Sequence, residues 1–259
     1  MRLENVEDIY PLAPLQQGLL FHSLSAPEAG LYCNQALFTL EGNLNVPAFQ
    51  RAWQRVVEHH PILRTSFVWD GVKEPVQVVH RQAEFSLVHH DWRRETPEAQ
   101  QENLGKILHA DLEQGFDLAK APLLRALLLQ TAEDRHEFLW NFHHILMDGW
   151  SMFQVLHETF ATYEAYTRGQ EHQLVRPRPY RDYLAWLRRQ SLPQAEAFWR
   201  KTLKGFTART PLLVDRLAES KKGEEFASQL LALSAETTGA LEAMAQKYHL
   251  TLNTLLQGA

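Results

Sequence analysis

Apolar residues return at a helical spacing in several segments of the chain. The clearest segment is 47–60, which begins with a proline suited to the first turn of a helix and is followed by Pro61, where a helix should stop. One stripe of this segment recurs every three or four positions and consists of Phe49, Trp53, Val56 and His60. We therefore expect an amphipathic helix over 47–60.

The same spacing predicts further helices over 15–24, 97–112 and 152–167. The first should turn one side, formed by Leu15, Leu19 and His22, towards the protein. Ser151 and Gln154 have the spacing of a capping box, so they should begin the third. One or two amphipathic helices are expected over 182–203, and a last helix-like segment closes the chain.

Other segments alternate apolar and polar positions, as strands do. Residues 62–69 alternate in this way, and Asp70-Gly71 is a turn signal that leads into a second strand over 76–79. Segments 123–130 and 136–144 predict two more strands joined by a polar turn. Helices and strands are thus mixed throughout the chain, with hairpins as well as crossovers. The expected fold class is α/β or α+β.

The basic, proline-rich segment Arg176–Tyr180 is the best internal boundary. We predict one lobe over 1–175, and over 176–259 a linker with the incomplete start of a second lobe. A polar stretch at 221–225 interrupts the helices of this second part. Residues 250–259 carry no signal that ends a helix, which suggests that the chain stops inside an element.

Composition narrows the class of protein. Of the 259 residues 45% are hydrophobic, which is typical of a chain that buries a sizeable core. No apolar run approaches the roughly 18 residues of a membrane span, and the N-terminus lacks the pattern of a signal peptide. Cys33 is the single cysteine, so no internal disulfide forms and a reducing cytoplasm is the expected setting. A net charge of -5 without a long basic block argues against nucleic acid as the main partner.

The stretch FHHILMDGWS, residues 142–151, concentrates the candidate chemistry. Successive side chains of a strand point to opposite faces, so His143 and His144 should not act as a pair of bases on one atom. Asp148 and Gly149 fall in the predicted turn before a helix, whose first turn offers N–H donors. His144 could therefore handle a proton while backbone N–H groups stabilise an oxyanion.

The residues alone leave other interpretations of this stretch open. A histidine on an apolar strand is more often a hydrogen-bonded core residue than a catalyst, and paired histidines also occur at 59–60 and 89–90. Adjacent histidines on opposite faces are poorly placed to share a metal ion, and no clear third ligand follows. A nucleophile is poorly supported, because no G-x-S-x-G motif occurs and Cys33 has no flanking activation signal.

Residues 143–151, HHILMDGWS, match the HHxxxDG signature of condensation domains from nonribosomal peptide synthetases. Three further motifs stand in the order that this family shows. YPLAPLQQGLLFHSL (10–24) resembles its opening motif, EHHPILRTSF (58–67) its RHExLRTxF motif, and YRDYLAWL (180–187) its YxDYAxW motif. Four ordered motifs are far more specific than HxxxD alone, so the chain resembles a condensation domain.

The resemblance also has departures. His59 and Pro61 stand where the family usually has arginine and glutamate, so roles tied to those two side chains do not carry over. The family domain is longer than this chain and forms a V of two lobes, each similar to chloramphenicol acetyltransferase. On this resemblance the chain covers the N-terminal lobe, the linker and the first helices of the C-terminal lobe. We therefore expect the chain by itself to be inactive.

The resemblance implies an acyltransferase of secondary metabolism that forms peptide bonds, for example in antibiotic biosynthesis. The two substrates are aminoacyl or peptidyl thioesters on the 4'-phosphopantetheine arms of donor and acceptor carrier proteins. The acceptor amine attacks the donor thioester carbonyl, and the product is an amide. The implied partners are these carrier proteins and adjacent synthetase domains, with no directly bound cofactor, metal, nucleic acid or membrane.

Three residues are assigned to catalysis by this resemblance: His144, His143 and Gly149. His144 matches the central histidine, which accepts a proton from the amine or holds the amine by a hydrogen bond. The ordinary histidine pKa of about 6.5 permits either role. His143 is expected to orient the loop. Gly149 is expected to offer its N–H to the oxyanion, or to be present only for its conformation.

Four more residues receive structural roles. Asp148 is expected to form a buried ion pair with Arg64, whose rupture would cost several kcal/mol; the alternative for Arg64 is a surface strand residue. Trp150 and Ser151 are expected to pack and cap the following helix.

Two other functions stay open. The chain could be a non-catalytic fragment that docks carrier proteins or serves as a scaffold, because the substrate channel of the family lies between the lobes. It could also be an epimerising relative, although the order DGWS favours condensation. The histidines argue against heterocyclising relatives, in which aspartate stands in this motif.

Overall fold

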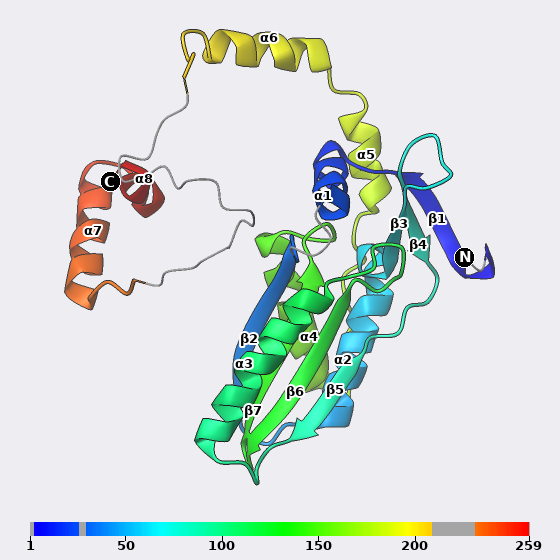
Figure 1. The fold of residues 1–259 in the computed structure, drawn as a ribbon, viewed down its shortest axis with the longest axis vertical. Helices are drawn as coiled ribbons and strands as arrows, with labels where there is room; N and C mark the ends of the chain where they lie inside the picture. Colours follow the sequence, from blue (N-terminus) through cyan, green and yellow to red (C-terminus); the bar gives the residue numbers. More distant parts are fainter. Residues whose placement is uncertain (1–2, 26–29, 209–230, 259) are drawn as a thin grey trace. The chain divides into compact units, whose positions relative to one another are not determined.

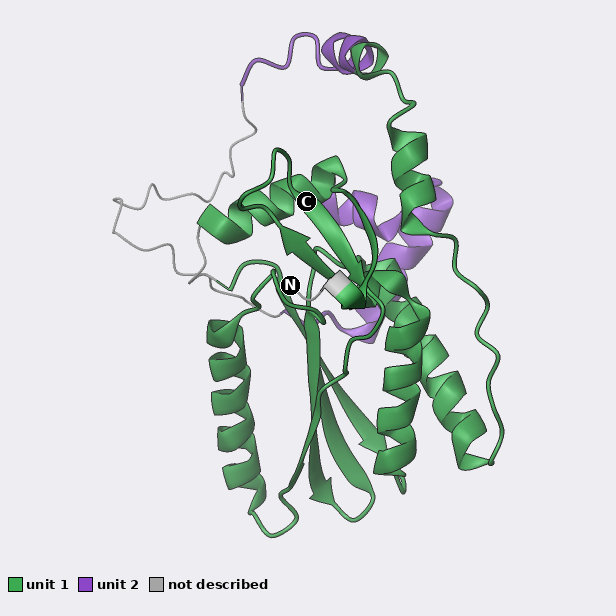
Figure 2. Ribbon diagram, turned by 90° about the vertical axis from the view of Figure 1, so that its right-hand side faces the viewer, with its two compact units in different colours: residues 1–195 green, residues 196–259 purple. Residues whose placement is uncertain are grey.

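The computed structural model describes residues 3–25, 30–208 and 231–258. The chain divides into two compact units, residues 1–195 and residues 196–259 (Figure 2). The linker region belongs to the first unit because helix α5 (Tyr180–Leu187) buries Leu184 against Tyr10 and Val79. The lobe boundary expected at 175/176 stays a prediction. The polar stretch expected at 221–225 lies outside the described residues.

The first unit contains two sheets flanked by helices (Figure 1). The larger sheet has the strand order β2 (Cys33–Glu41), β7 (Arg135–His143), β6 (Leu124–Ala132) and β5 (Leu87–Asp91). Its β5–β6 pair is parallel and the other pairs are antiparallel. The smaller sheet is antiparallel, with the order β1 (Val6–Pro11), β4 (Val76–His80) and β3 (Thr65–Val68). This architecture confirms the mixed α and β class.

Helices cover both faces of the larger sheet (Figure 1). On one face lie α2 (Val46–His59) and α4 (Gly149–Thr167), and on the other lies α3 (Pro97–Gln114). Strand β7 is buried on both sides, and its even-numbered aromatic residues belong to the core under α2. Trp53 of α2 lies 4.8 Å from Trp140 of β7, ring centre to ring centre. The large buried aromatic rings fix β7, and thereby the position of the histidines at its end.

Helix α2 forms as the spacing predicts. Asn45 caps its first turn by accepting a hydrogen bond from the Ala48 N–H at 3.1 Å, and the helix ends at His59, before Pro61. The short helix α1 (Pro14–Ser25) also forms, but its predicted facing is wrong. Leu15 is 75% exposed, and the buried side of α1 consists of Gln16, Leu19 and Leu20.

One strand prediction needs correction. The segment 61–64 is a short 3-10 helix, η3 (Pro61–Arg64), because Pro61 starts a new turn, and only Thr65–Val68 continue as a strand. Three strands were not expected: β1, β2 and β5. A further 3-10 helix, η1 (Leu3–Asn5), precedes β1. Strands β4, β6 and β7 confirm the remaining predictions.

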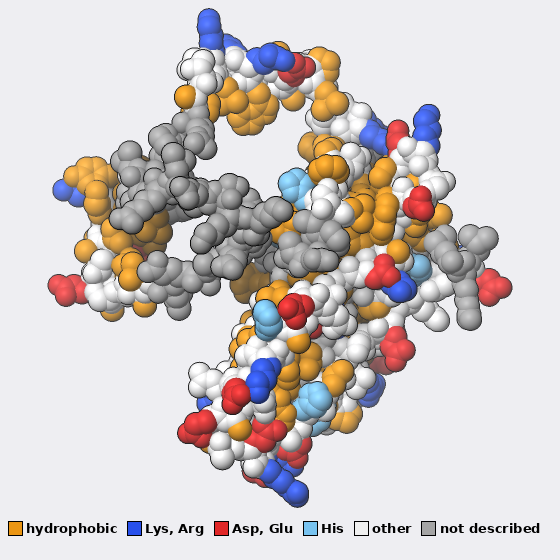
Figure 3. Space-filling model, viewed as in Figure 1, with side chains coloured by type: hydrophobic (Ala, Val, Ile, Leu, Met, Phe, Trp, Pro, Cys, Tyr) orange, Lys and Arg blue, Asp and Glu red, His pale blue; other side chains and the backbone are white. Residues whose placement is uncertain are grey.

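The last part of the chain contains α6 (Leu192–Thr202), α7 (Ala235–Lys247) and α8 (Leu252–Gly258), in agreement with the helices expected there. Several large apolar side chains of α5 and α6 are exposed, and Figure 3 shows hydrophobic side chains on both helices. In the described part of the chain, no helix combines the length and the apolar character needed to cross a membrane.

Candidate active site

The paired histidines lie where β7 ends. His143 is the last residue of the strand, and His144 begins the loop that leads to α4. The next three residues, Ile145, Leu146 and Met147, are 2%, 6% and 6% exposed. Their burial holds the loop against the core, so the two histidines stand on a rigid base.

The ring of His143 is buried, and both of its nitrogens are occupied. Its Nδ1 accepts a hydrogen bond from the Ile145 N–H at 3.1 Å, so the proton of the neutral ring sits on Nε2. Nε2 lies 3.2 Å from Ser23 Oγ, whose hydroxyl donates to the carbonyl of Leu19 at 2.8 Å. Burial, and next the charge of His144, lower the pKa of His143 to about 4. His143 is therefore neutral at physiological pH and has no free lone pair for a base.

The neighbouring ring of His144 is only partly buried. Its backbone N–H donates to the carbonyl of Tyr32 at 2.8 Å, and its Nδ1 lies 3.2 Å from the side-chain nitrogen of Asn34. Among the described residues, Nε2 of His144 has no hydrogen-bond partner. The ring of His144 is thus held through Nδ1, and its Nε2 is left for another partner.

The two histidines line separate cavities. His144 lines one of about 410 Å³, together with Leu15 and Leu19 of α1 and Tyr183 and Leu187 of α5 among its wall residues. His143 lines a smaller one of about 180 Å³, which also touches Ser23 and Cys33. Strand alternation predicts this separation, and the structure confirms it. The larger cavity is therefore lined by His144 and not by His143.

Two buried glutamine side chains support the loop that follows His144. Gln16 of α1 donates to the carbonyl of Ile145 at 3.2 Å, and its Oε1 accepts the backbone N–H of Ala13 at 3.0 Å. Gln77 of β4 donates to Gln16 Oε1 and to the carbonyl of Pro11, both at 3.0 Å. Helix α1, strand β4 and the histidine loop are therefore joined through one amide pair.

Asp148 caps helix α4. Its Oδ1 accepts the Ser151 backbone N–H at 2.9 Å and the Ser151 hydroxyl at 2.8 Å. These hydrogen bonds hold the pKa of Asp148 below its usual value. The side chain is exposed, and the expected buried ion pair between Asp148 and Arg64 is wrong. The expected capping box is wrong as well, because Asp148 and not Ser151 precedes the first turn of the helix.

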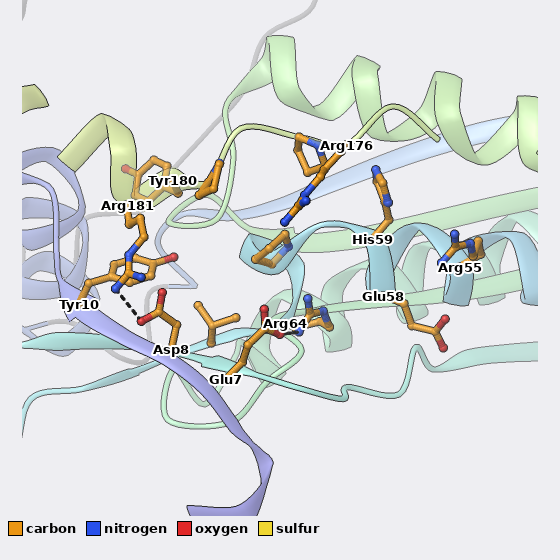
Figure 4. Close-up of a pocket in the computed structure, with 14 residues that line it drawn as sticks. Glu7, Asp8, Tyr10, Arg55, Glu58, His59, Arg64, Arg176, Tyr180 and Arg181 are labelled. Atoms are coloured by element: carbon orange, nitrogen blue, oxygen red, sulfur yellow. Dashed lines mark hydrogen bonds and ion pairs between the residues drawn. The ribbon is translucent and has the colours of Figure 1, made fainter. Parts of the chain in front are cut away.

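Arg64 instead pairs with strand β1. The residue is 5% exposed, and its guanidinium donates to Glu7 Oε2 at 2.8 Å and to the carbonyl of His80. Figure 4 shows this region, where Glu7 and Arg64 lie on one side of a cavity and a dashed line joins Asp8 to Arg181. Arg64 is thus a buried residue of the structural support and not a surface strand residue.

The structure removes one expected role from each of the next two residues, Gly149 and Trp150. Gly149 does not have a positive φ, and a Cβ at this position would meet nothing within 4 Å, so conformation does not require glycine here. Trp150 is 88% exposed, so its expected packing against the helix is wrong. The first turn of α4 therefore depends on Asp148 and Ser151.

Sequence reasoning missed several residues around His144. Gln16 and Ser23 lie inside the first motif but gave no signal of their own, because polar residues of an amphipathic helix usually face water. Asn34 gave no signal because its strand was not predicted. Only the pairing of β2 with β7, which places Asn34 opposite Phe142, brings it to the end of the histidine strand.

Other chemistry is not favoured by the surroundings. Burial raises the pKa of Cys33, which is the opposite of what a thiolate nucleophile requires. Within residues 3–25, 30–208 and 231–258, no three His, Cys, Asp or Glu side chains gather in a set that could hold a metal ion.

Comparison with known proteins gives one family. The model of the condensation domain matches residues 6–259. A linear gramicidin synthase protein of Brevibacillus parabrevis is 42% identical over 254 residues, which are 98% of this chain and 5% of the relative. Bacitracin synthase 3 of Bacillus licheniformis is 35% identical over 97% of this chain and 4% of the relative. The chain thus spans a small part of the curated relatives that it matches.

Solved structures share the fold. The first condensation domain of the calcium-dependent antibiotic synthetase, in complex with a substrate analogue, matches with a TM-score of 0.76 and 19% identity. That match covers 95% of this chain and 58% of the other. The starter condensation domain of rhizomide synthetase matches with a TM-score of 0.67 and 22% identity, over 76% of this chain and 50% of the other.

Proposed function

The chain belongs to the condensation-domain family, and we propose that it carries the catalytic histidine of a peptide-bond-forming acyltransferase. The substrates are two thioesters on carrier proteins, one of which supplies the attacking amine and the other the carbonyl. One observation carries the proposal. Nε2 of His144 has no partner among the described residues and His144 lines a cavity of about 410 Å³, while both nitrogens of His143 are in use.

In this proposal His144 is the group that meets the reacting atoms. Amide formation needs an amine held close to the thioester carbonyl and stabilisation of the negative charge that develops on its oxygen. His143 orients the loop through its bonds to Ile145 and Ser23. The N–H of Gly149, in the first turn of α4, is a second candidate for the oxyanion.

The remaining roles are structural. Asp148 starts α4, and Arg64 connects η3 to β1 and β4. Both hold the loop that carries His144 in place.

The partners in this proposal are donor and acceptor peptidyl carrier proteins and the adjacent domains of a synthetase. Their 4'-phosphopantetheine arms deliver the substrates, so the domain itself needs no bound cofactor. A reducing cytoplasm is the proposed location, supported by the single cysteine of the chain, Cys33.

The test is a condensation assay with loaded donor and acceptor carrier proteins. A full-length domain that contains this chain should form the amide, and His144→Ala should lower the rate about 100-fold or more. His90→Ala, which removes an exposed histidine of β5, is the matched control and should leave the rate unchanged. An unaltered rate for His144→Ala would contradict the assignment.

One observation favours a second function for the chain by itself. It spans 58% of the solved relative, so it could bind a carrier protein without catalysing the reaction. We expect residues 1–259 alone to give no product. Amide formation by this chain alone would contradict that expectation, while α-hydrogen exchange without amide formation would indicate an epimerising enzyme.

A further inference from the structure

The ring of His144 has a polar neighbour on strand β2. The side-chain nitrogen of Asn34 lies 3.2 Å from Nδ1 of His144. Asn34 belongs to β2, which pairs with β7, and its partner in register is Phe142, two residues before His144. Tyr32, just before the same strand, accepts the backbone N–H of His144 at 2.8 Å. The start of β2 therefore holds both the backbone and the ring of this histidine.

We infer that Asn34 is a positioning residue that fixes the tautomer of His144. An amide nitrogen carries hydrogens and has no lone pair to offer, so it donates and Nδ1 of His144 accepts. The proton of the neutral ring then sits on Nε2. An asparagine does not ionise, so its side-chain nitrogen remains a donor at any pH. The catalytic role of this tautomer rests on the proposed function, whereas the hydrogen bond that sets it does not.

The two adjacent rings end up in the same tautomer with different consequences. In His143 the Nε2 proton is directed at Ser23, so it is not available to a substrate. In His144 the Nε2 proton has no partner among the described residues. His144 lines the larger cavity, so on this inference its Nε2 proton is a hydrogen-bond donor there.

This tautomer excludes proton acceptance from the amine, one of the roles open to the central histidine. In amide formation the C–N bond forms, the carbonyl oxygen becomes negative, and the C–S bond then breaks. One amine proton passes to the departing sulfur, so the products are an amide and a thiol. Neutral His144 with its proton on Nε2 stabilises the negative oxygen as a donor and takes up no proton. It is not the base that deprotonates the amine.

The tautomer can be measured in this chain without any enzymatic assay. We expect nitrogen NMR of the histidine-labelled 259-residue chain at pH 8 to show Nε2 protonated and Nδ1 unprotonated in His144. Asn34→Asp places a carboxylate, which only accepts, beside Nδ1, and should move the proton to Nδ1. His143 is the internal reference and should keep its proton on Nε2 in every variant. A proton on Nδ1 of His144 in the unsubstituted chain overturns the inference.

A matched substitution on the same strand controls for damage to β2. The side-chain nitrogen of Gln35 donates a hydrogen bond to the carbonyl of Leu108. Gln35 therefore binds helix α3 and not the histidines. Gln35→Leu should leave the tautomer of His144 unchanged, whereas Asn34→Leu should give a mixture of both tautomers. If Asn34→Leu and Asn34→Asp both leave the signals of His144 as they were, Asn34 does not set the tautomer.

Kinetics separate this inference from the proposed function. In a full-length domain that contains this chain, Asn34→Asp should lower kcat about 100-fold at pH 8, because the donor to the oxyanion is lost. Gln35→Leu should keep kcat within about twofold of the unsubstituted domain, since it touches no reacting group. Unaltered kcat in Asn34→Asp overturns the positioning role and leaves the proposed function intact. Absence of amide from the unsubstituted domain contradicts the proposed function, while the NMR result still decides the tautomer.

Discussion

The side-chain amides of Gln16 and Gln77 face each other and exchange two hydrogen bonds. Gln77 donates to Gln16 at 3.0 Å, and Gln16 donates back at 3.3 Å. Both residues are buried, with 5% and 0% of their surface exposed. Since Gln16 also bonds the carbonyl of Ile145, this pair connects helix α1 and strand β4 to the residue that follows His144.

We predict that this amide pair is coupled energetically. Replacing one member leaves buried polar atoms of the other without a partner, so Gln16→Leu or Gln77→Leu should lower the free energy of unfolding by about 1–3 kcal/mol. The double variant should lose clearly less than the two single losses added together. Urea denaturation of the four proteins measures this coupling, and strict additivity would show that the pair is not a unit.

The ion pair between Arg64 and Glu7 predicts the size of the coupling free energy between these two residues. The side chain of Glu7 is 41% exposed, so solvent screening limits the pair to about 0.5–1 kcal/mol. A double-mutant cycle with Arg64→Met and Glu7→Gln should recover this value. The parallel cycle with Asp148→Asn is the control and should give no coupling. Coupling to Asp148 of several kcal/mol would restore the ion pair that the sequence suggested.

The cap at Asp148 predicts a modest and specific loss. Asp148→Ala removes the acceptor of two hydrogen bonds from Ser151, and should lower the free energy of unfolding by about 1 kcal/mol. Asp148→Ser and Asp148→Asn retain a capping oxygen and should keep most of this stabilisation. Chemical denaturation distinguishes the cap from a buried ion pair, whose loss would exceed about 3 kcal/mol.

Burial of His143 predicts a loss of stability in acid. Its pKa is about 4 in the folded chain against about 6.5 for an unperturbed histidine. Between these two values the unfolded chain binds a proton that the folded chain does not, so stability falls as pH falls. The stabilisation is complete above about pH 6.5 and decreases by about 3 kcal/mol on the way to pH 4.

A substitution isolates the contribution of this ring. In His143→Asn, whose side-chain oxygen can still accept the Ile145 N–H, the change in unfolding free energy between pH 6 and 5 should be smaller by about 1 kcal/mol than in the unsubstituted chain. His90→Asn, at an exposed position, is the control and should leave the slope alone. If the unfolding free energy changed with pH equally in both variants, His143 would not be neutral and buried.

Periodicity alone predicted most helices and several strands of this fold. The stripe of Phe49, Trp53 and Val56 and the flanking prolines determine α2, because a helix buries every third or fourth residue whatever it packs against. Strand alternation in β7 likewise separated His143 from His144. Strands β1, β2 and β5 escaped prediction, because strand signals depend strongly on neighbouring strands.

The mixed fold class, the family and the separation of His143 from His144 thus follow from the residues in order along the chain, since they depend on local spacing and on the succession of four motifs. Which polar groups meet depends instead on how the chain folds. Glu7 reaches Arg64 across 57 positions, Gln16 reaches Ile145 across 129, and Asn34 reaches His144 across 110. Hydrogen bonds between residues so distant in the chain follow from the pairing of strands and the burial of helix faces, and no short pattern contains that information.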